Sequence, residues 1–271
     1  MEANAFKSIT TDIHSDIMAR LIATEEEYNV RVLLAIESGS RAWGFASATS
    51  DYDVRFIYVH QRDWYLSVDA ADKRDVIEYP IVDDIDINGW ELRKALKLFN
   101  RSNPSFVEWI NSPIVYRCEG GFADQARALL PKLYCVEKGI HHYRSMAKTN
   151  YRGYLQGDLV PYKKYLYVLR ALLSVRWLER FATPAPIEFS TLLHRVVEDE
   201  SLVGEINHLL ARKRVAGERA LSPTIKPINH FIETELLRLA RYAGKYGRSN
   251  EHMDELNGLF RRTLAEGAEV L

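Results

Sequence analysis

Gly39-Ser-Arg-Ala-Trp-Gly-Phe-Ala-Ser-Ala-Thr-Ser-Asp-Tyr-Asp53 is the stretch that decides the fold of this 271-residue chain. It follows a short apolar run, 32–36, which predicts a buried strand ending in a turn at Gly39-Ser40. Residues 52–60 then alternate between two faces, which predicts a second strand. The stretch therefore joins two strands of one sheet through a glycine turn and a short polar spacer.

Two carboxylates open the second strand. Asp51 and Asp53 are separated by one residue, and side chains at that spacing point to the same face of a strand. Their negative charges repel unless a cation lies between them, and Mg²⁺ prefers carboxylate and phosphate oxygens. Gly39 lets the backbone N–H groups approach phosphate oxygens, and the Ser40 hydroxyl can donate to them as well. The residues predict a metal-and-phosphate site, although an aspartate-capped turn before an edge strand is the simpler alternative.

A third carboxylate is expected on the next acidic strand, because two-metal phosphoryl chemistry usually needs one more ligand. An extended stretch over 81–87 carries Asp86 as the first candidate. Asp84 is the alternative, since it shares that face two residues earlier. Glu78 precedes the break at Pro80, and Asp83 points to the opposite face of a regular strand.

The remaining periodicity divides the chain near residue 120. Before it, helical spacing over 11–24, from Glu91 onward and over 105–109 surrounds the strands, with further extended pieces at 76–79 and 114–116. After Gly120-Gly121 the pattern is nearly all helical. The expected helices are 122–130, 136–155, 161–181, 190–200, 202–215, 227–245 and 250–267. The sequence predicts a unit of strands and helices over residues 1–120, followed by a helical domain over residues 121–271.

Composition points to an ordinary soluble protein, with 47% hydrophobic and 27% charged residues. No apolar run is long enough to span a bilayer, and the N-terminus lacks a signal pattern, so a cytoplasmic location without membrane partners is expected. Cys118 and Cys135 are too far apart for a zinc motif and are expected to be buried thiols.

Charge is unevenly distributed along the chain. Eleven acidic and four basic residues lie between Asp51 and Glu91, whereas nine basic and two acidic residues lie between Lys138 and Arg180. In the basic segment Lys163, Tyr167, Arg170 and Ser174 share one helix face. Such a mixture of cations and aromatics suits a nucleotide or single-stranded RNA, although buried tyrosines with solvated cations would look the same. The basic cluster 212–214 is expected to be a solvated helix end.

These motifs resemble the DNA polymerase β-type nucleotidyltransferase superfamily. More narrowly, Gly39-Ser-Arg-Ala-Trp-Gly and Ser50-Asp-Tyr-Asp-Val-Arg are similar to predicted nucleotidyltransferases of the YcgL type, which are associated with an RNA-repair pathway. The same group shares Asp86-Ile-Asn-Gly-Trp-Glu-Leu-Arg, Glu108-Trp109 and Lys163-Lys-Tyr-Leu-Tyr-Val-Leu-Arg170. The resemblance covers about residues 32–180.

The resemblance implies an α+β fold, in which a small mixed sheet with flanking helices is followed by an all-helical C-terminal domain. It also implies Mg²⁺-dependent (or Mn²⁺-dependent) transfer of a nucleoside monophosphate from an NTP to a hydroxyl. By position, Gly39 and Ser40 would contact the triphosphate, and Asp51, Asp53 and Asp86 would form the catalytic metal site. Further nucleotide-binding candidates are Arg41, Ser50, Lys163 and Arg170, although Arg41 could equally be a surface residue.

The acceptor stays open between an RNA 3′ end, which the basic segment favours, a protein hydroxyl and a small molecule. The alternative function is a non-catalytic nucleotide-binding module, such as a sensor or a toxin–antitoxin-like partner. The sequence predicts neither the nucleobase nor the oligomeric state.

Overall fold

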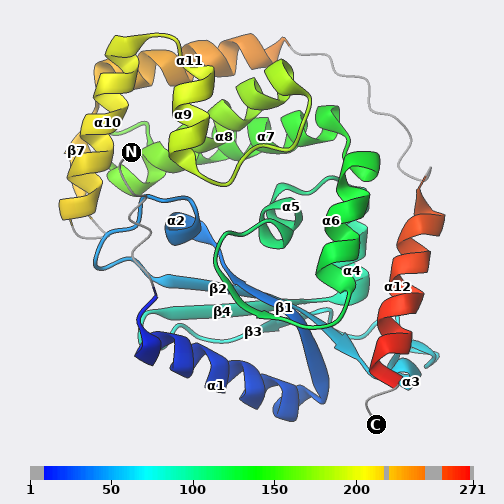
Figure 1. Ribbon diagram of the computed structural model, residues 1–271. Coiled ribbons are helices and arrows are strands. Elements are labelled where there is room, and N and C mark those ends of the chain that lie inside the picture. The colour runs from blue at the N-terminus through cyan, green and yellow to red at the C-terminus, as the bar shows by residue number, and fades with distance from the viewer. Residues whose placement is uncertain (1–8, 217–219, 242–251, 269–271) are drawn as a thin grey trace.

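The computed structural model describes residues 9–216, 220–241 and 252–268. Its centre is a five-stranded mixed sheet with the strand order β3-β4-β2-β1-β5. The strands are β1 Val30–Glu37, β2 Tyr52–His60, β3 Val76–Glu78, β4 Ile85–Glu91 and β5 Val115–Cys118. All pairs are antiparallel except β2 and β4, which are parallel neighbours. Helices lie on both sides of this sheet (Figure 1).

One face of the sheet packs on α1, which spans Thr11–Tyr28. The Thr10 side chain accepts the backbone N–H of Ile13, and Asn29 ends the helix in the left-handed conformation. Ile17 and Leu21 of α1 are buried against strand residues that include Val54 and Phe56. Because residues of β2 alternate, the intervening residues Asp53, Arg55 and Ile57 lie on the opposite face.

That opposite face packs on helices from both ends of the chain. They are α4 Leu92–Asn100, α5 Pro104–Ile110, α6 Phe122–Leu133 and α12 Met253–Ala268. Leu33 and Ile57 of the sheet share one core cluster with Leu256 and Leu259 of α12. We call this sheet, together with α1 to α6 and α12, the sheet half. It includes two short helices, α2 Gly39–Ala42 and α3 Arg62–Tyr65.

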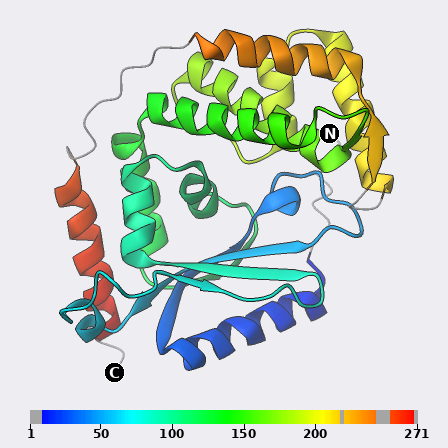
Figure 2. The same ribbon diagram turned by 180° about the vertical axis from the view of Figure 1, so that it is seen from behind.

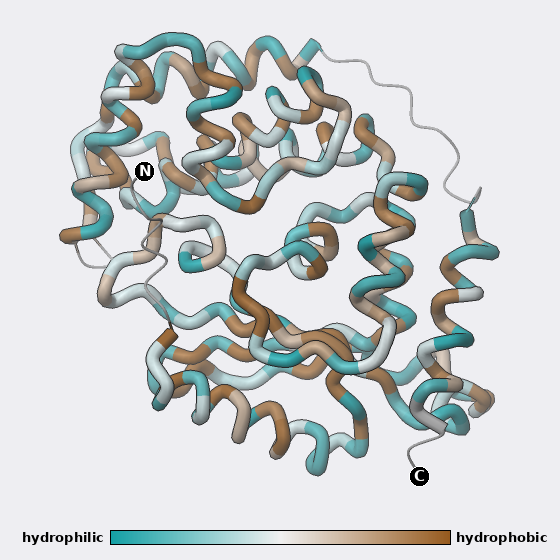
Figure 3. Tube along the Cα trace, in the orientation of Figure 1, coloured by the Kyte–Doolittle hydropathy of each residue, from teal (hydrophilic) through white to brown (hydrophobic). Residues whose placement is uncertain are grey.

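The helical half has its own core of buried residues and lies across α2 and α5 from the sheet (Figure 1). Its helices are α7 Val136–Tyr154, α8 Tyr162–Phe181, α9 Phe189–Val196, α10 Glu200–Val215 and α11 Lys226–Ala240. A two-stranded ribbon, β6 Leu159–Pro161 with β7 Leu221–Pro223, joins it. The view from behind shows the same layering, with α1 and the helical half on opposite sides of the sheet (Figure 2). Hydrophobic residues gather along the strands and the inner sides of the helices (Figure 3).

The α+β prediction is confirmed, with corrections in detail. The strand predicted over 81–87 begins only at Ile85, because Asp83 and Asp84 adopt positive φ angles of 54° and 60° and form a turn. The short β6–β7 ribbon was not predicted in the helical part. Parts of the helices predicted over 227–245 and 250–267 lie outside the described residues.

The division at residue 120 stays a prediction. Core packing groups α6 and α12 with the sheet, although both follow residue 120 in sequence. Cys118 is exposed and Cys135 is half-buried, so the prediction of two buried thiols was wrong. Cys118 is the last residue of β5, which lies at one edge of the sheet. Within the described ranges, no helix combines the length and apolar character needed to cross a bilayer.

Candidate active site

The Gly39 turn lies directly against Asp53. Gly39 follows β1 with a φ of +60°, and the Ser38 N–H donates to the Asp53 carbonyl oxygen at 2.8 Å. A Cβ atom at position 39 would lie only 1.9 Å from Oδ2 of Asp53. Glycine is therefore required both by the left-handed backbone and by the neighbouring carboxylate. Ser40 is buried in the first turn of α2.

Asp53 and Asp86 face each other on neighbouring strands. They are register partners in the parallel β2–β4 pair, so the sheet brings together two carboxylates that are 33 positions apart in sequence. Arg55 bridges them: its Nη2 atom lies 3.1 Å from Oδ1 of Asp53 and 2.7 Å from Oδ2 of Asp86. Asn88 donates to Oδ1 of Asp86. Burial raises the pKa of Asp53, and the charges of Asp86 and Asp51 raise it further, whereas Arg55 and Lys163 oppose the shift.

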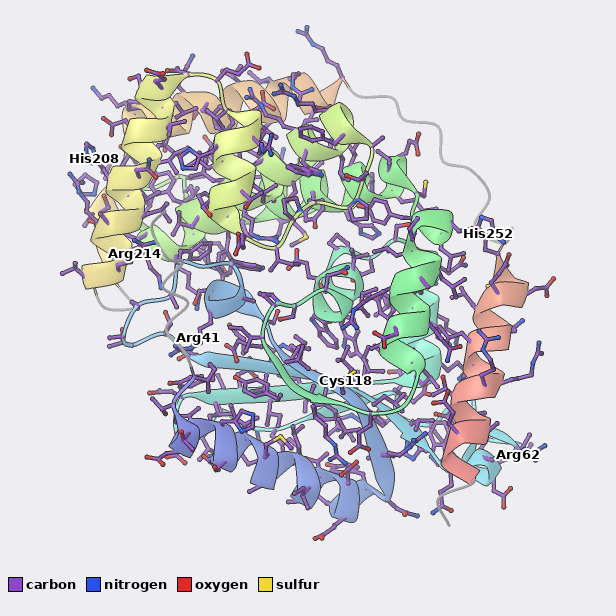
Figure 4. The ribbon with its side chains drawn as sticks, in the orientation of Figure 1. Arg41, Arg62, Cys118, His208, Arg214 and His252 are labelled. Atoms are coloured by element: carbon purple, nitrogen blue, oxygen red, sulfur yellow. The ribbon has the colours of Figure 1, made fainter. Side chains whose placement is uncertain are left out.

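The spacer between the turn and the carboxylates is held by Arg41. Its guanidinium donates to the carbonyl oxygens of Ser50, at 2.5 Å, and Asp51, at 3.1 Å. It also lies 3.8 Å from the centre of the Tyr52 ring. These contacts fix the backbone on which Asp51 is carried. Figure 4 shows Arg41 in α2, near the N-terminal end of β2.

Glu37 contacts the backbone of Asp53 and was not among the predicted site residues. Its buried carboxylate accepts the backbone N–H of Asp53 at 3.0 Å and the hydroxyl of Tyr116 at 2.6 Å. Burial raises the pKa of Glu37 to about 7. The signal was available in the sequence, since an acidic residue ends an otherwise apolar strand immediately before the Gly-Ser turn.

Lys163 and Tyr167 bring the helical half to the site. The positive charge of Lys163 opposes the rise in the pKa of Asp53 that burial causes. One turn later, the Tyr167 ring meets the Trp43 ring edge-on, with centroids 5.1 Å apart. The predicted shared face of α8 is thus turned toward the Gly39–Asp53 motif.

Arg170, on the same face, has a different environment. Its Nη1 atom lies 2.7 Å from Oε1 of Glu108 in a pair that is almost fully buried, with 3% and 10% of the two side chains exposed. The guanidinium also lies over the Trp43 ring, and Glu108 accepts from the Trp43 indole N–H at 3.0 Å and from the Tyr143 hydroxyl. Arg170 was predicted to bind nucleotide, yet these contacts join α8 to α5 and to the motif tryptophan.

The prediction that the basic cluster 212–214 is a solvated helix end was wrong for Lys213. Its ammonium group is buried and lies 2.8 Å from Oγ of Ser50 and 3.5 Å from Oγ of Ser47. Arg212 and Arg214 on either side are exposed. The helical spacing from Leu202, Ile206 and Leu209 to position 213 would have placed this lysine on the buried face of α10.

The alternatives for the third carboxylate lie elsewhere. Asp83 and Asp84 are exposed in the turn before β4, where Asp83 pairs with Arg20 at 3.0 Å. Glu78 is exposed on β3 and pairs with Arg74. Asp86 is thus the carboxylate that β4 places beside Asp53.

The carboxylates fit a divalent cation in their donor chemistry. Across the described parts of the chain, no group of three or more His, Cys, Asp or Glu side chains is arranged to hold a metal ion. Asp53 and Asp86 nevertheless bind one cationic group already, the guanidinium of Arg55. Carboxylate oxygens are also the ligands that Mg²⁺ prefers, so the donor chemistry of the pair fits such a cation.

Comparison with known proteins identifies the family of the chain. The sequence matches the RNA repair pathway DNA polymerase beta family over residues 13–262. It is 45% identical over 251 residues to the uncharacterized protein YcgL of Bacillus subtilis (strain 168), covering 92% of this chain and 96% of that protein. A crystal structure of a nucleotidyltransferase-like protein from Exiguobacterium sibiricum 255-15 aligns over 92% of both chains, with 13% identity and a TM-score of 0.30, a likeness too weak to carry an argument. From the extent of the family match, the chain belongs to the RNA repair pathway DNA polymerase beta family, a family of polymerase β-type nucleotidyltransferases.

Proposed function

We propose that the protein transfers a nucleoside monophosphate from an NTP to an acceptor hydroxyl and releases pyrophosphate. The observation that carries this proposal is the close approach of the Gly39 turn to Asp53, whose register partner on the neighbouring parallel strand is Asp86. A glycine turn beside paired carboxylates can hold phosphates and the cation that neutralises them in one place.

In this reaction the acceptor oxygen attacks the α-phosphorus, and the bond between the α-phosphorus and the bridging oxygen breaks. Gly39 and Ser40 would bind the triphosphate, and Asp53 and Asp86 would hold Mg²⁺ or Mn²⁺ between them. We propose Asp51 as a further ligand, which would have to move toward this pair when the cation binds. When bound, such a cation neutralises charge on the phosphates and on the leaving pyrophosphate. Asp86 would orient the acceptor hydroxyl or accept its proton.

The helical half would complete the nucleotide site through Lys163, whose charge already acts on Asp53. We assign Arg41 and Ser50 to holding the spacer, because their contacts run to its backbone and to Lys213. We assign Arg170 to the joint between the halves, because Glu108 pairs with it in the interior.

The acceptor is best sought among RNA 3′ ends. Lys164 lies 3.9 Å from the ring centre of the exposed Tyr154, and Lys163 lies beside Tyr167 on the same end of α8. Cations next to accessible aromatic rings suit a single-stranded nucleic acid, whose phosphates and bases they can contact together.

An acceptor screen tests the proposal. Each of the four NTPs, labelled at the α-phosphate, is incubated with Mg²⁺ or Mn²⁺ and with RNA, protein or small-molecule hydroxyl acceptors. Transfer of label is expected with the unaltered protein and not with Asp53→Asn. Equal transfer by Asp53→Asn would refute the assigned site.

A non-catalytic nucleotide-binding module is the second candidate. One observation favours it: both carboxylate oxygens of Asp86 already accept hydrogen bonds within the protein, Oδ2 from Arg55 and Oδ1 from Asn88. Saturable NTP binding that requires Asp53, with no transfer to any acceptor in the screen, would support this second function.

A further inference from the structure

Arg55 is held in place by four groups at the edge of the site. Its Nη2 atom contacts the carboxylates of Asp53 and Asp86, at 3.1 and 2.7 Å. Its Nη1 atom donates to the carbonyl oxygens of Val54 and Asp86, at 2.9 and 2.7 Å. Only 17% of the side chain is exposed. A planar guanidinium with fixed backbone and carboxylate partners is a built part of the site rather than an occasional surface pair.

The same contacts use the oxygens that a divalent cation would need. In Asp86, Oδ2 binds Arg55 and Oδ1 accepts from Asn88 at 2.5 Å. In Asp53, Oδ1 binds Arg55, whereas Oδ2 is turned toward Gly39. A cation that bridges Oδ1 of Asp53 and Oδ2 of Asp86, the two oxygens that Nη2 of Arg55 joins, would therefore have to displace the guanidinium.

We propose that Arg55 is the resident counter-ion of the Asp53–Asp86 pair and keeps divalent cations off it until a nucleotide binds. The phosphates of the nucleotide offer the guanidinium another anionic partner, and the carboxylates then become available to the cation. Metal binding is thereby made dependent on the nucleotide. The nucleotide-dependent step rests on the proposed function, whereas the competition between Arg55 and the cation does not.

Direct titration with Mn²⁺ tests the competition in the absence of nucleotide. Free Mn²⁺ is followed by electron paramagnetic resonance in the unaltered protein and in Arg55→Gln. Arg55→Gln should bind Mn²⁺ at least about tenfold more tightly, because removing a charge-assisted contact frees both carboxylates. Arg55→Gln combined with Asp86→Asn should lose the gain, which assigns it to this pair.

Arg62→Gln is the matched control, since it removes the same charge from an exposed residue at the start of α3, just after the opposite end of β2 (Figure 4). It should bind Mn²⁺ like the unaltered protein. The competition is refuted if Arg55→Gln, with an unchanged circular dichroism spectrum, binds no more tightly than the unaltered protein, or if Arg62→Gln gains as much.

Arg55→Lys keeps the test decisive if Arg55→Gln does not fold. Lysine retains the charge but lacks the planar fork, so an intermediate Mn²⁺ affinity is expected, and an affinity equal to that of the unaltered protein would contradict the proposal.

The nucleotide arm uses a non-hydrolysable NTP analogue. It should raise the Mn²⁺ affinity of the unaltered protein toward that of Arg55→Gln, after subtraction of Mn²⁺ held by the free analogue. An unchanged affinity would overturn the nucleotide-dependent step. Absence of label transfer in the acceptor screen would instead refute the proposed catalysis and leave the Mn²⁺ comparison between the variants intact.

Discussion

In the sheet half, Asp53 and Asp86 meet because β2 and β4 are parallel neighbours in register. In the helical half, Lys163 and Arg170 share one face of α8, yet one acts on Asp53 and the other is buried against Glu108. In a strand, the two-residue repeat sets the face on which a side chain lies, and the pairing of strands sets its neighbour across the sheet. A helix face is contacted by several elements, and the role of each residue depends on which of them it meets.

The largest effect is expected at the joint between the halves. Glu108→Gln leaves the Arg170 guanidinium buried without its carboxylate, which typically costs about 3–5 kcal/mol of unfolding free energy. Chemical denaturation measures the loss. Glu78→Gln, in the exposed pair with Arg74, is the matched control and should cost at most about 1 kcal/mol.

A double variant sharpens this result. Adding Arg170→Met to Glu108→Gln removes the unpaired charge and should restore part of the stability, since an intact buried pair adds little over apolar packing. If Glu108→Gln alone loses less than about 1 kcal/mol, Arg170 is not the joint between the halves and its assignment to nucleotide binding regains weight.

Next in size is the change at the glycine turn. Gly39→Ala places a Cβ atom against Oδ2 of Asp53 and should lower transfer about 100-fold, because displacing a reacting group by an ångström has effects of this order. Steady-state kinetics with the accepted NTP measure it. Gly44→Ala is the control: its φ is also positive, at +86°, but its Cβ would meet nothing within 4 Å. Similar loss of activity in both variants would mean that backbone strain, not the Asp53 contact, is responsible.

Lys213→Met tests the contact that sequence reasoning missed. Removing the ammonium takes one donor from the Ser50 hydroxyl, which keeps its hydrogen bonds to Ser47, so the cost is about 0.5–1.5 kcal/mol. The change also loosens the spacer before Asp51. KM for the NTP should rise more than kcat falls. The exposed neighbours Arg212 and Arg214 supply controls in the same cluster, and their Met variants should be unaffected. An equal effect in all three would point to general electrostatics instead.

Features that depend on residues close together in sequence could be predicted, whereas contacts between residues far apart in sequence could not. The strands around the motif, the two-residue spacing of Asp51 and Asp53, and the choice of Asp86 all rest on local periodicity, and the β2–β4 register then places Asp53 and Asp86 opposite each other. Glu108 and Arg170 are 62 residues apart, and Lys213 is 163 residues from Ser50. No local pattern encodes such partners, because they are chosen when the two halves pack.

The bridge made by Arg55 was missed for a different reason. Its position on the site face was correctly predicted from strand alternation, but its partner Asp86 lies on another strand, and only the pairing of the strands brings the two together. The turn at Asp83-Asp84 was missed because the alternation of polar and apolar residues does not reveal which residues adopt the left-handed conformation.

A smaller difference, in NTP affinity, is expected between variants of the two lysines in the first turn of α8. Lys163→Met should weaken NTP binding about tenfold with little loss of stability, because its charge acts on Asp53 across the two halves. Lys164→Met is the neighbouring control, since that ammonium lies closest to the Tyr154 ring, 3.9 Å from its centre. Isothermal titration with a non-hydrolysable NTP measures both. Weaker nucleotide binding in Lys164→Met than in Lys163→Met would reverse the assignment of the two residues.

The smallest effect is expected within the sheet half, away from the site. His60 ends β2 and stacks on Trp64 with ring centroids 4.0 Å apart, and burial lowers its pKa from 6.5 to about 4. A lowered histidine pKa gives stability that is complete above pH 6.5 and is lost as the pH falls toward 4, because the unfolded chain takes up the proton first. Since the side chain is partly exposed, the loss should be only about 1 kcal/mol. His60→Phe keeps the stacking and should flatten this part of the pH profile of unfolding free energy, while NTP binding at pH 7.5 stays unchanged. An unaltered slope would show that other groups set the acid sensitivity, and altered NTP binding would show that the far end of β2 is coupled to the carboxylates after all.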